Sequence, residues 1–230
     1  MPQAVLASRR DVGGSLTLVT FDVDHETAEG YVMPGQYVEV KTPQAKGYFV
    51  LSSDSGAPQW QLLIRGAGGA AAEILSAPIG TTFEISKALG NGFPLADAGR
   101  RELVVGVVAS ALGAARPSLR YRMSASVAAR TRVLLGVRRP TDVPLMDEVD
   151  SWRAGGVQVI LCVSSDADDP DVLPGIIRER GYVQTVLQRT LSTSRIAQDA
   201  LVVAAGPKAM LEEVRGLTKS FPALEVITNA

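Results

Sequence analysis

The stretch of this 230-residue sequence that points most directly to chemistry is a glycine-rich run followed by alanines. Gly66-Ala67-Gly68-Gly69-Ala70-Ala71 precedes residues of high helix propensity that continue to Ser76. The first backbone N–H groups of a helix have no partner within the helix, and they attract anions such as the phosphates of a nucleotide. The run therefore predicts either a phosphate site that needs no arginine or, as the simpler alternative, only a turn before a helix.

Side chains that act as nucleophiles or metal ligands are scarce. The sequence has one cysteine, Cys162, in an apolar run, and one histidine, His25, among acidic residues. Iron–sulfur clusters and most zinc sites need several such ligands, so no metal site is expected and any redox chemistry needs an organic cofactor. We interpret His25 as a solvated loop residue and Cys162 as core, and we assign no catalytic side chain.

Composition and charge exclude several other classes of function. The hydrophobic fraction is 46%, which indicates a globular protein, and the formal net charge is −1 with acidic and basic residues interspersed. No field of one sign would recruit nucleic acid. No run approaches the roughly 18 apolar residues that span a bilayer, and the first residues lack a signal-peptide layout. We therefore expect a cytoplasmic protein without membrane insertion.

Turn signals and apolar periodicity divide the chain into two unlike halves. Up to about residue 98, short apolar runs alternate with breakers such as Gly13-Gly14, which is typical of an antiparallel barrel, and one short helix is expected over residues 70–76. From Arg101 on, apolar strands alternate with longer helical stretches, which is typical of a parallel sheet covered on both faces. Ligands of such sheets lie at the carboxyl ends of the strands. The expected barrel strands are 5–6, 16–23, 37–40, 48–51, 60–64 and 81–85; the expected parallel strands are 103–109, 132–136, 157–163, 201–204 and 225–228; and the expected helices between them are 114–123, 143–154, 182–191 and 207–221.

Short motifs along the chain resemble, in the same order, those of the ferredoxin–NADP⁺ reductase-like family. Pro34-Gly35-Gln36-Tyr37-Val38 resembles its PGQYV strand entry, and residues 90–95 are similar to the GNGFPL that closes the flavin domain in electron-transfer subunits of dihydroorotate dehydrogenase. The later motifs are Gly136-Val137-Arg138-Arg139-Pro140, which looks like G-x-R-x-P; Trp152 on the following helix; Ala205-Gly206-Pro207 with Met210, which is similar to CGP-x-x-M; and Ile227-Thr228-Asn229, which is similar to a terminal I-x-T-N.

The resemblance implies a fold and a function. The fold is two-domain: an N-terminal antiparallel β-barrel of the flavin-reductase type over residues 1–98, and a C-terminal α/β parallel-sheet domain of the NAD(P)-binding type over residues 99–230. The implied cofactors are FAD and NAD. The implied function is transfer of hydride between a nicotinamide nucleotide and flavin, followed by transfer of electrons to an acceptor that the sequence does not identify. Hydride transfer needs no acid or base from the protein. A catalytically degenerate binding or regulatory protein with the same fold is the open alternative.

The flavin-binding strand departs from the family's R-x-Y-S pattern. Gly47, Phe49 and Val50 stand at those three positions, so the aromatic wall remains while the arginine and the hydroxyl are lost. A shift by one residue would offer Lys46 and Tyr48 instead, at the cost of a bulge in the strand. A divergent branch that includes plant fruit-type FAD/NAD-binding proteins looks similar in lacking this arginine. Phe49 as a flavin wall and Phe49 as barrel core both remain open.

The nucleotide loop departs as well. The family's G-T-G-I-A-P corresponds to residues 111–116, which keep one glycine, Gly113, and the family's cysteine is replaced by Ala205. Arg116, Arg120 and Arg122 follow the loop and would either serve a phosphate or form the solvated face of a helix.

The choice of nucleotide is predicted from the strand end at Ser164-Ser165. Members that select NADP commonly carry a Ser-Arg pair there, and here the arginine is absent. Asp166, Asp168 and Asp169 would repel a 2′-phosphate if they face the site, although an acidic loop that faces solvent is the alternative. NADH is therefore favoured. All candidate cofactor-binding residues are Tyr48, Phe49, Val50, Leu51, Gly66, Gly68, Gly69, Ala70, Ala71, Gly113, Arg138, Gly206 and Pro207.

Overall fold

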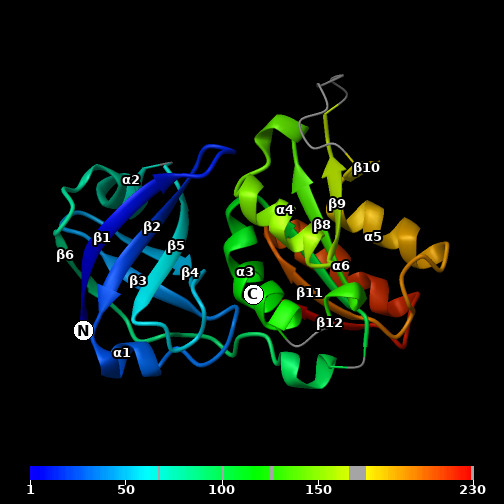
Figure 1. The fold of residues 1–230 in the computed structure, drawn as a ribbon, viewed down its shortest axis with the longest axis horizontal. Coiled ribbons are helices and arrows are strands. Elements are labelled where there is room, and N and C mark those ends of the chain that lie inside the picture. Colours follow the sequence, from blue (N-terminus) through cyan, green and yellow to red (C-terminus); the bar gives the residue numbers. More distant parts are fainter. Residues whose placement is uncertain (67, 100, 125–126, 166–174, 229–230) are drawn as a thin grey trace.

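Two six-stranded sheets, one antiparallel and one parallel, lie side by side in the protein (Figure 1). The computed structural model describes residues 1–66, 68–99, 101–124, 127–165 and 175–228. The strands of the antiparallel sheet lie between Gln3 and Ile85, and those of the parallel sheet lie between Leu103 and Thr228.

The antiparallel sheet is closed into a barrel. Its strand order is β4-β3-β6-β1-β2-β5. A bridge between Leu51 and Leu62 joins the two outer strands, and the Ser52 N–H donates to the Gln61 carbonyl at 2.7 Å. The elements are β1 (Gln3–Asp11), β2 (Leu16–Val23), α1 (His25–Glu29), β3 (Tyr37–Lys41), β4 (Lys46–Val50), β5 (Gln59–Arg65), α2 (Gly69–Ser76) and β6 (Thr82–Ile85).

Alternation along the strands builds the barrel core. In β1, Ala4 and Leu6 are fully buried while Val5 between them is exposed, because successive side chains of a strand point to opposite faces. Trp60 and Phe21 are the large side chains of this core, and Ile74 of helix α2 packs into the same cluster. The helix therefore packs on the barrel core through Ile74, with Ala71 and Leu75 against the same cluster.

The parallel sheet has helices on both faces. Its order is β10-β9-β8-β7-β11-β12, and α3 and α4 contribute to the core on one face while α5 and α6 contribute to the core on the other. Strand β7, Leu-Val-Val-Gly-Val-Val, is buried along nearly its whole length because both its faces are covered. The elements are η1 (Leu95–Ala98), β7 (Leu103–Val108), η2 (Ala109–Ala111), α3 (Leu112–Ser124), η3 (Ala128–Arg130), β8 (Thr131–Val137), η4 (Pro140–Asp142), α4 (Met146–Ala154), β9 (Gln158–Val163), β10 (Ile177–Arg180), α5 (Val183–Ser192), β11 (Leu201–Ala205), α6 (Lys208–Gly216), η5 (Leu217–Lys219) and β12 (Glu225–Thr228).

The predicted fold class and the predicted strands and α-helices are confirmed, while α-helix α1, strand β10 and short 3₁₀ helices such as η1 were not predicted. His25 lies in helix α1 rather than in a loop, where the Asp24 carboxylate accepts the Thr27 N–H at 2.8 Å as an N-cap. Strand β10 has one apolar residue, Ile177, which is itself exposed, so this edge strand carries no hydrophobic alternation that sequence reading detects.

The two domains share one hydrophobic cluster. Leu16 and Leu63 of the barrel pack in the same cluster as Leu112 and Leu145 of the α/β domain. The Leu145 N–H also donates to the Val12 carbonyl at 2.7 Å. This packing along the boundary, called the seam below, places strand β4 next to the loops that follow the parallel strands.

Candidate functional site

The seam holds a cavity of about 330 Å³, called the ring cavity below, between strand β4 and the loops after β7 and β11. This volume lies within the range of roughly 300–1,000 Å³ that is usual for small-molecule sites. The predicted wall and the predicted Gly-Pro turn come together here, whereas Leu51 is fully buried in the barrel core. The lining, which is mostly apolar and suits a flat ring, consists of Tyr48, Phe49, Val50, Leu63, Val108, Ser110, Ala111, Gly206 and Pro207.

Phe49 lies where both alternatives that the sequence left open can hold together, and its contact with a flavin stays a prediction. It lines the ring cavity and also packs against the barrel core. A Cβ added at Gly47 would lie 2.8 Å from Cε2 of Phe49 and 3.2 Å from Cβ of Ala70. An arginine at position 47 would therefore displace the Phe49 ring or helix α2. The observed position of the Phe49 ring thus requires a glycine at position 47.

The alternative alignment through Lys46 and Tyr48 is wrong in one respect, because β4 has no bulge. Strands β3 and β4 pair in regular register from Tyr37–Val50 to Lys41–Lys46. Lys46 instead lies 3.3 Å from the Glu39 carboxylate and 5.9 Å from the centre of the Tyr48 ring. Tyr48 is exposed at one end of the ring cavity.

The start of helix α2 presents free backbone donors. Gly68 is the N-cap, no side chain caps this end, and Gly68 and Gly69 have φ values of +99° and +56°. A Cβ added at either residue would meet no atom within 4 Å, so space is open in front of both. Ala70 is buried and Ala71 half-buried, so these residues offer only their N–H groups, while Gly66 faces Leu75. The run can therefore hold an anion through its backbone.

A second cavity of about 600 Å³, called the nucleotide cavity below, lies at the carboxyl ends of the parallel strands. Ligands bind at this edge in open α/β sheets. Val108 and Pro207 line both cavities, so the two spaces are adjacent. Its other lining residues include Gly14, Leu16, Arg65, Gly136, Arg138, Arg139, Cys162, Ser164, Tyr182 and Met210.

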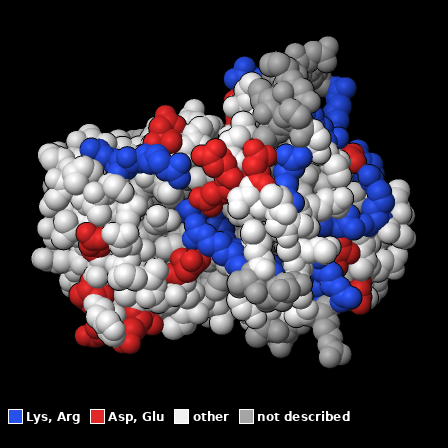
Figure 2. All heavy atoms as spheres, viewed as in Figure 1, with Lys and Arg blue, Asp and Glu red and all other residues white. Residues whose placement is uncertain are grey.

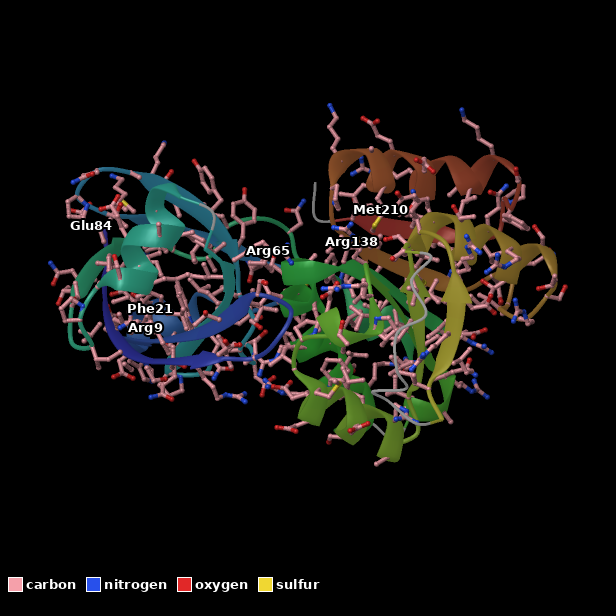
Figure 3. The ribbon with its side chains drawn as sticks, turned by 90° about the horizontal axis from the view of Figure 1, so that it is seen from above. Arg9, Phe21, Arg65, Glu84, Arg138 and Met210 are labelled. Carbon is pink, nitrogen blue, oxygen red and sulfur yellow. The ribbon has the colours of Figure 1, made fainter. Side chains whose placement is uncertain are left out.

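Three arginines line the nucleotide cavity, and sequence reading singled out two of them. Arg138 is exposed, and Arg139 pairs with Asp142 at 3.4 Å. Arg65, which was missed, ends strand β5 and donates to the Gly14 carbonyl at 3.3 Å. Figure 3 shows Arg65 on the barrel side and Arg138 on the α/β side of the same space. The signal for Arg65 was its place directly before the glycine-rich run.

Two of the three arginines of helix α3 are buried and so form no solvated face. Arg116 is buried at the seam, where it binds Glu148, and Arg122 is buried against the Ala98 carbonyl and the Thr131 hydroxyl. Arg120 is half-buried and bridges Asp54 and Glu148, at 3.2 Å and 3.7 Å. For Arg116 and Arg122 the prediction was wrong, because their partners are brought to them by packing.

Two glycines of the nucleotide motifs are required by packing. A Cβ added at Gly113 would lie 3.3 Å from the Leu63 Cβ and the Ser52 Oγ, so this glycine lets helix α3 approach the barrel. A Cβ at Gly206 would lie 2.9 Å from Val108 Cγ2. Contact of either residue with a cofactor stays a prediction.

No nucleophile or metal cluster accompanies the two cavities. Cys162 lines the nucleotide cavity, but burial raises the pKa of its thiol to about 12, so the thiolate is not available. His25 is exposed and lies 3.4 Å from Glu29. Among the described residues, no three His, Cys, Asp or Glu side chains are grouped to hold a metal ion, and no helix is long and apolar enough to cross a membrane. Asp166, Asp168 and Asp169 lie outside the described residues.

Comparison with known proteins gave matches in sequence and in structure. No family model matches the chain. The fruit protein pKIWI502 of Actinidia deliciosa is 25% identical over 203 residues, which is 81% of this chain and 62% of that protein, so the chain spans less than two thirds of the relative's length.

Solved structures match over nearly the whole chain. The cytochrome P450 reductase GcoB of Amycolatopsis matches with a TM-score of 0.80 and 18% identity over 99% of this chain and 69% of its own. A ferredoxin–NADP⁺ reductase of Neisseria gonorrhoeae, crystallised with FAD and NADP, matches with a TM-score of 0.75 and 11% identity over 99% of this chain and 98% of its own.

Proposed function

We propose that this chain, which has the two-domain fold of ferredoxin–NADP⁺ reductase-like proteins, is a flavin-dependent oxidoreductase module. It takes hydride from a nicotinamide nucleotide onto FAD and passes electrons to an acceptor, a protein or a small molecule. One observation carries the proposal: the apolar wall of β4 and the loops at the ends of β7 and β11 face each other across the ring cavity, which adjoins the nucleotide cavity. In this proposal the division between the two modules lies at residue 98, in helix η1.

The chain's residues fit FAD in shape and in hydrogen-bond donors. Phe49 and Val50 would lie against the flavin ring, and the N–H groups of Gly68, Gly69 and Ala70 would hold the pyrophosphate, with Ala71 and Gly66 completing the turn. The flavin supplies the redox chemistry when bound, while the protein supplies orientation and excludes water. Support for the cofactor comes from the structural match to a reductase crystallised with FAD and NADP.

The nucleotide cavity would take the dinucleotide, with its pyrophosphate near the cations. Arg65 and Arg138 line this cavity from opposite sides of the seam, and a pyrophosphate is the anion that NADH and NADPH share. NADH is favoured because Ser165, directly after the cavity residue Ser164, stands where members that select NADP carry the arginine that meets a 2′-phosphate. The backbone around the dinucleotide would be shaped by Gly113, Gly206 and Pro207.

The alternative function is a reductase fold without turnover, as a binding or regulatory protein. The specific observation that favours it is the loss of polar groups at both sites. Gly47 and Val50 replace an arginine and a hydroxyl on β4, and Leu112, which is fully buried, stands at the start of α3 where the family's G-T-G-I-A-P has a threonine hydroxyl. Such a protein would keep the scaffold and at most one of the two ligands.

A spectroscopic experiment separates the two functions. The purified protein, incubated with FAD and desalted, is expected to show the flavin absorbance bands, and anaerobic NADH is expected to bleach them faster than NADPH does. Bands that persist after either nucleotide is added would contradict reductase activity and support the binding protein. Absence of bands would contradict the flavin site itself. Faster bleaching by NADPH would contradict only the nucleotide preference.

A further inference from the structure

Arg116 makes the most extensive polar contact across the seam. Its side chain is 3% exposed. The guanidinium donates from Nε and Nη2 to the two carboxylate oxygens of Glu148 in helix α4, at 2.8 Å and 2.6 Å. From Nη1 it donates to the Ser52 carbonyl at 3.2 Å, the Ser52 Oγ at 2.9 Å and the Gln61 Oε1 at 3.1 Å, all in the barrel. One rigid guanidinium therefore joins both domains.

The barrel partners of Arg116 lie at the point where the barrel closes. The Ser52 N–H donates to the Gln61 carbonyl, and the adjacent residues Leu51 and Leu62 form the bridge between the outer strands. Val50, which lines the ring cavity, is two residues from Ser52. A displacement of Ser52 is therefore expected to displace Val50 and with it the barrel wall of the ring cavity.

The opposite wall of the ring cavity leads directly into the helix that carries Arg116. Ser110 and Ala111 line the cavity, and helix α3 begins at the next residue. The first turn of α3 abuts the barrel, because a Cβ at Gly113 would lie 3.3 Å from the Ser52 Oγ. Both walls are thus within a few residues of the same buried arginine.

A charged residue in this position holds its partners to one geometry. A guanidinium is planar and carries five N–H donors in fixed directions, and a buried one must satisfy them. Arg120 lies on the exposed side of the same contact and bridges Asp54 to Glu148, and Figure 2 shows basic side chains along the front of the seam with acidic ones beside them. Apolar packing alone would tolerate small slides between the domains. The bidentate pair with Glu148 fixes the guanidinium within the α/β domain, so the directions of its Nη1 bonds to Ser52 and Gln61 in the barrel are fixed as well.

We propose that Arg116 is a positioning residue that sets the separation of the two walls of the ring cavity. By holding the closing point of the barrel against helices α3 and α4, it fixes the distance across which hydride passes from nicotinamide to flavin. This role rests on the function proposed above, but the positioning itself is a property of the chain without ligands. A displacement of about 1 Å between reacting groups can slow a reaction on the order of 100-fold.

The helix offers a matched control in Arg122. It is also an arginine of α3 and is fully buried, but its donors bind the Ala98, Arg101 and Arg130 carbonyls and the Thr131 hydroxyl, and none binds a barrel strand. Arg122→Met therefore removes a buried guanidinium of the same helix without removing a bond to Ser52, Gln61 or Glu148. Arg116→Met removes the contact, and Arg116→Lys keeps the charge but not the bidentate geometry.

The first measurement needs no cofactor. Spin labels on Ile79→Cys in the barrel and Glu213→Cys in helix α6, both exposed, report the distance between the domains by pulsed electron paramagnetic resonance, while the buried Cys162 stays unlabelled. Arg116→Met is expected to broaden or shift the distance distribution, Arg116→Lys to do so less, and Arg122→Met to leave it as in the unmodified chain. An unchanged distribution in Arg116→Met would overturn the proposal, whatever its melting temperature.

The second measurement uses the FAD-loaded protein. At saturating NADH, Arg116→Met is expected to slow flavin reduction on the order of 100-fold with little change in nucleotide Kd, and Arg122→Met to leave the rate unchanged. Equal slowing by both variants would overturn the positioning role. Should Arg116→Met fail to fold, Ser52→Ala, which removes the Oγ acceptor only, is expected to give a smaller change in both measurements, and no change in either would also overturn it. If no variant, including the unmodified chain, is reduced by NADH, the proposed function fails while the distance measurement still decides the positioning.

Discussion

The barrel and the α/β domain offer different kinds of candidate binding group. The barrel offers neutral groups, namely the Phe49 and Val50 wall and the backbone N–H groups at Gly68 and Gly69. The α/β side offers cations at strand ends, Arg138 and Arg139, and the barrel adds Arg65 where the two meet. Under the proposed function, a flavin would be held on the barrel by shape and backbone dipoles, while an exchangeable nucleotide would be held by charge.

The largest expected effect tests the neutral groups of the barrel, here the backbone N–H groups that open helix α2. Gly69→Leu should abolish most flavin retention, because the side chain would fill the open space in front of the helix α2 N–H groups. Flavin absorbance after desalting is the measurement. Gly80→Leu is the matched control, since Gly80 also has positive φ, +90°, and open space, so the backbone strain of roughly 1–2 kcal/mol is similar. Equal retention in the two variants would contradict the backbone site.

A smaller effect is expected at the cationic half. Arg138→Ala should raise the Kd for NADH about tenfold, which corresponds to about 1.4 kcal/mol for a lost hydrogen bond to a charged group. Arg65→Ala should act in the same direction, since Arg65 lines the same cavity. Titration calorimetry measures both. Arg195→Ala is the control, because Arg195 pairs with Glu179 at 2.9 Å and does not belong to the lining of the nucleotide cavity.

Salt should distinguish the two halves in the unmodified chain. Raising the ionic strength from about 0.1 M to about 1 M shortens the Debye length from about 10 Å to about 3 Å. Nucleotide affinity should fall several-fold, because exposed Arg138 acts through charge. Flavin retention should change little, because the barrel half presents backbone dipoles and apolar contacts. Equal salt dependence of the two ligands would break the comparison.

The smallest expected effect concerns acid pH and the flavin strand. A hydrogen bond from the Tyr48 hydroxyl, and next the Lys46 ammonium, hold the pKa of Glu39 below its ordinary value. A carboxylate whose pKa is lower in the folded protein than in the unfolded chain stabilises the folded protein at pH values above the unfolded pKa, which is about 4.3. This contribution is lost as the pH falls through the folded-state pKa. Glu39→Gln should therefore be slightly less stable at neutral pH and should lose less on acidification, as urea unfolding at pH 7 and pH 3.5 would show. An equal loss of unfolding free energy on acidification in both proteins would mean that the Glu39 carboxylate does not stabilise β4.

Local patterns were sufficient for most elements and for part of the site. The glycine-rich run opens helix α2, and the segment 48–50 and the Gly206-Pro207 turn meet at one cavity, because each lies where strand and helix periodicity places it. Edge strand β10 was missed because it carries no buried face. Helix α1 was missed because its sequence is polar, and its stability depends on the Asp24 N-cap rather than on an apolar pattern. Arg65 was missed because its place directly before the glycine-rich run gives no sign of the nucleotide cavity, which packing between the domains brings to it.

By itself the sequence determined the two sheets, their order along the chain and the glycines that leave N–H groups free, because these follow from periodicities of 2 and 3.6 residues and from backbone geometry. Only the tertiary structure decided which arginine does what. Arg116 and Arg122 stand six residues apart on one helix and look alike in sequence, yet one binds Ser52 across the seam and the other binds the Ala98 carbonyl. A guanidinium's role is set by the acceptors it reaches, and here those acceptors are brought to it by packing between segments distant in the chain.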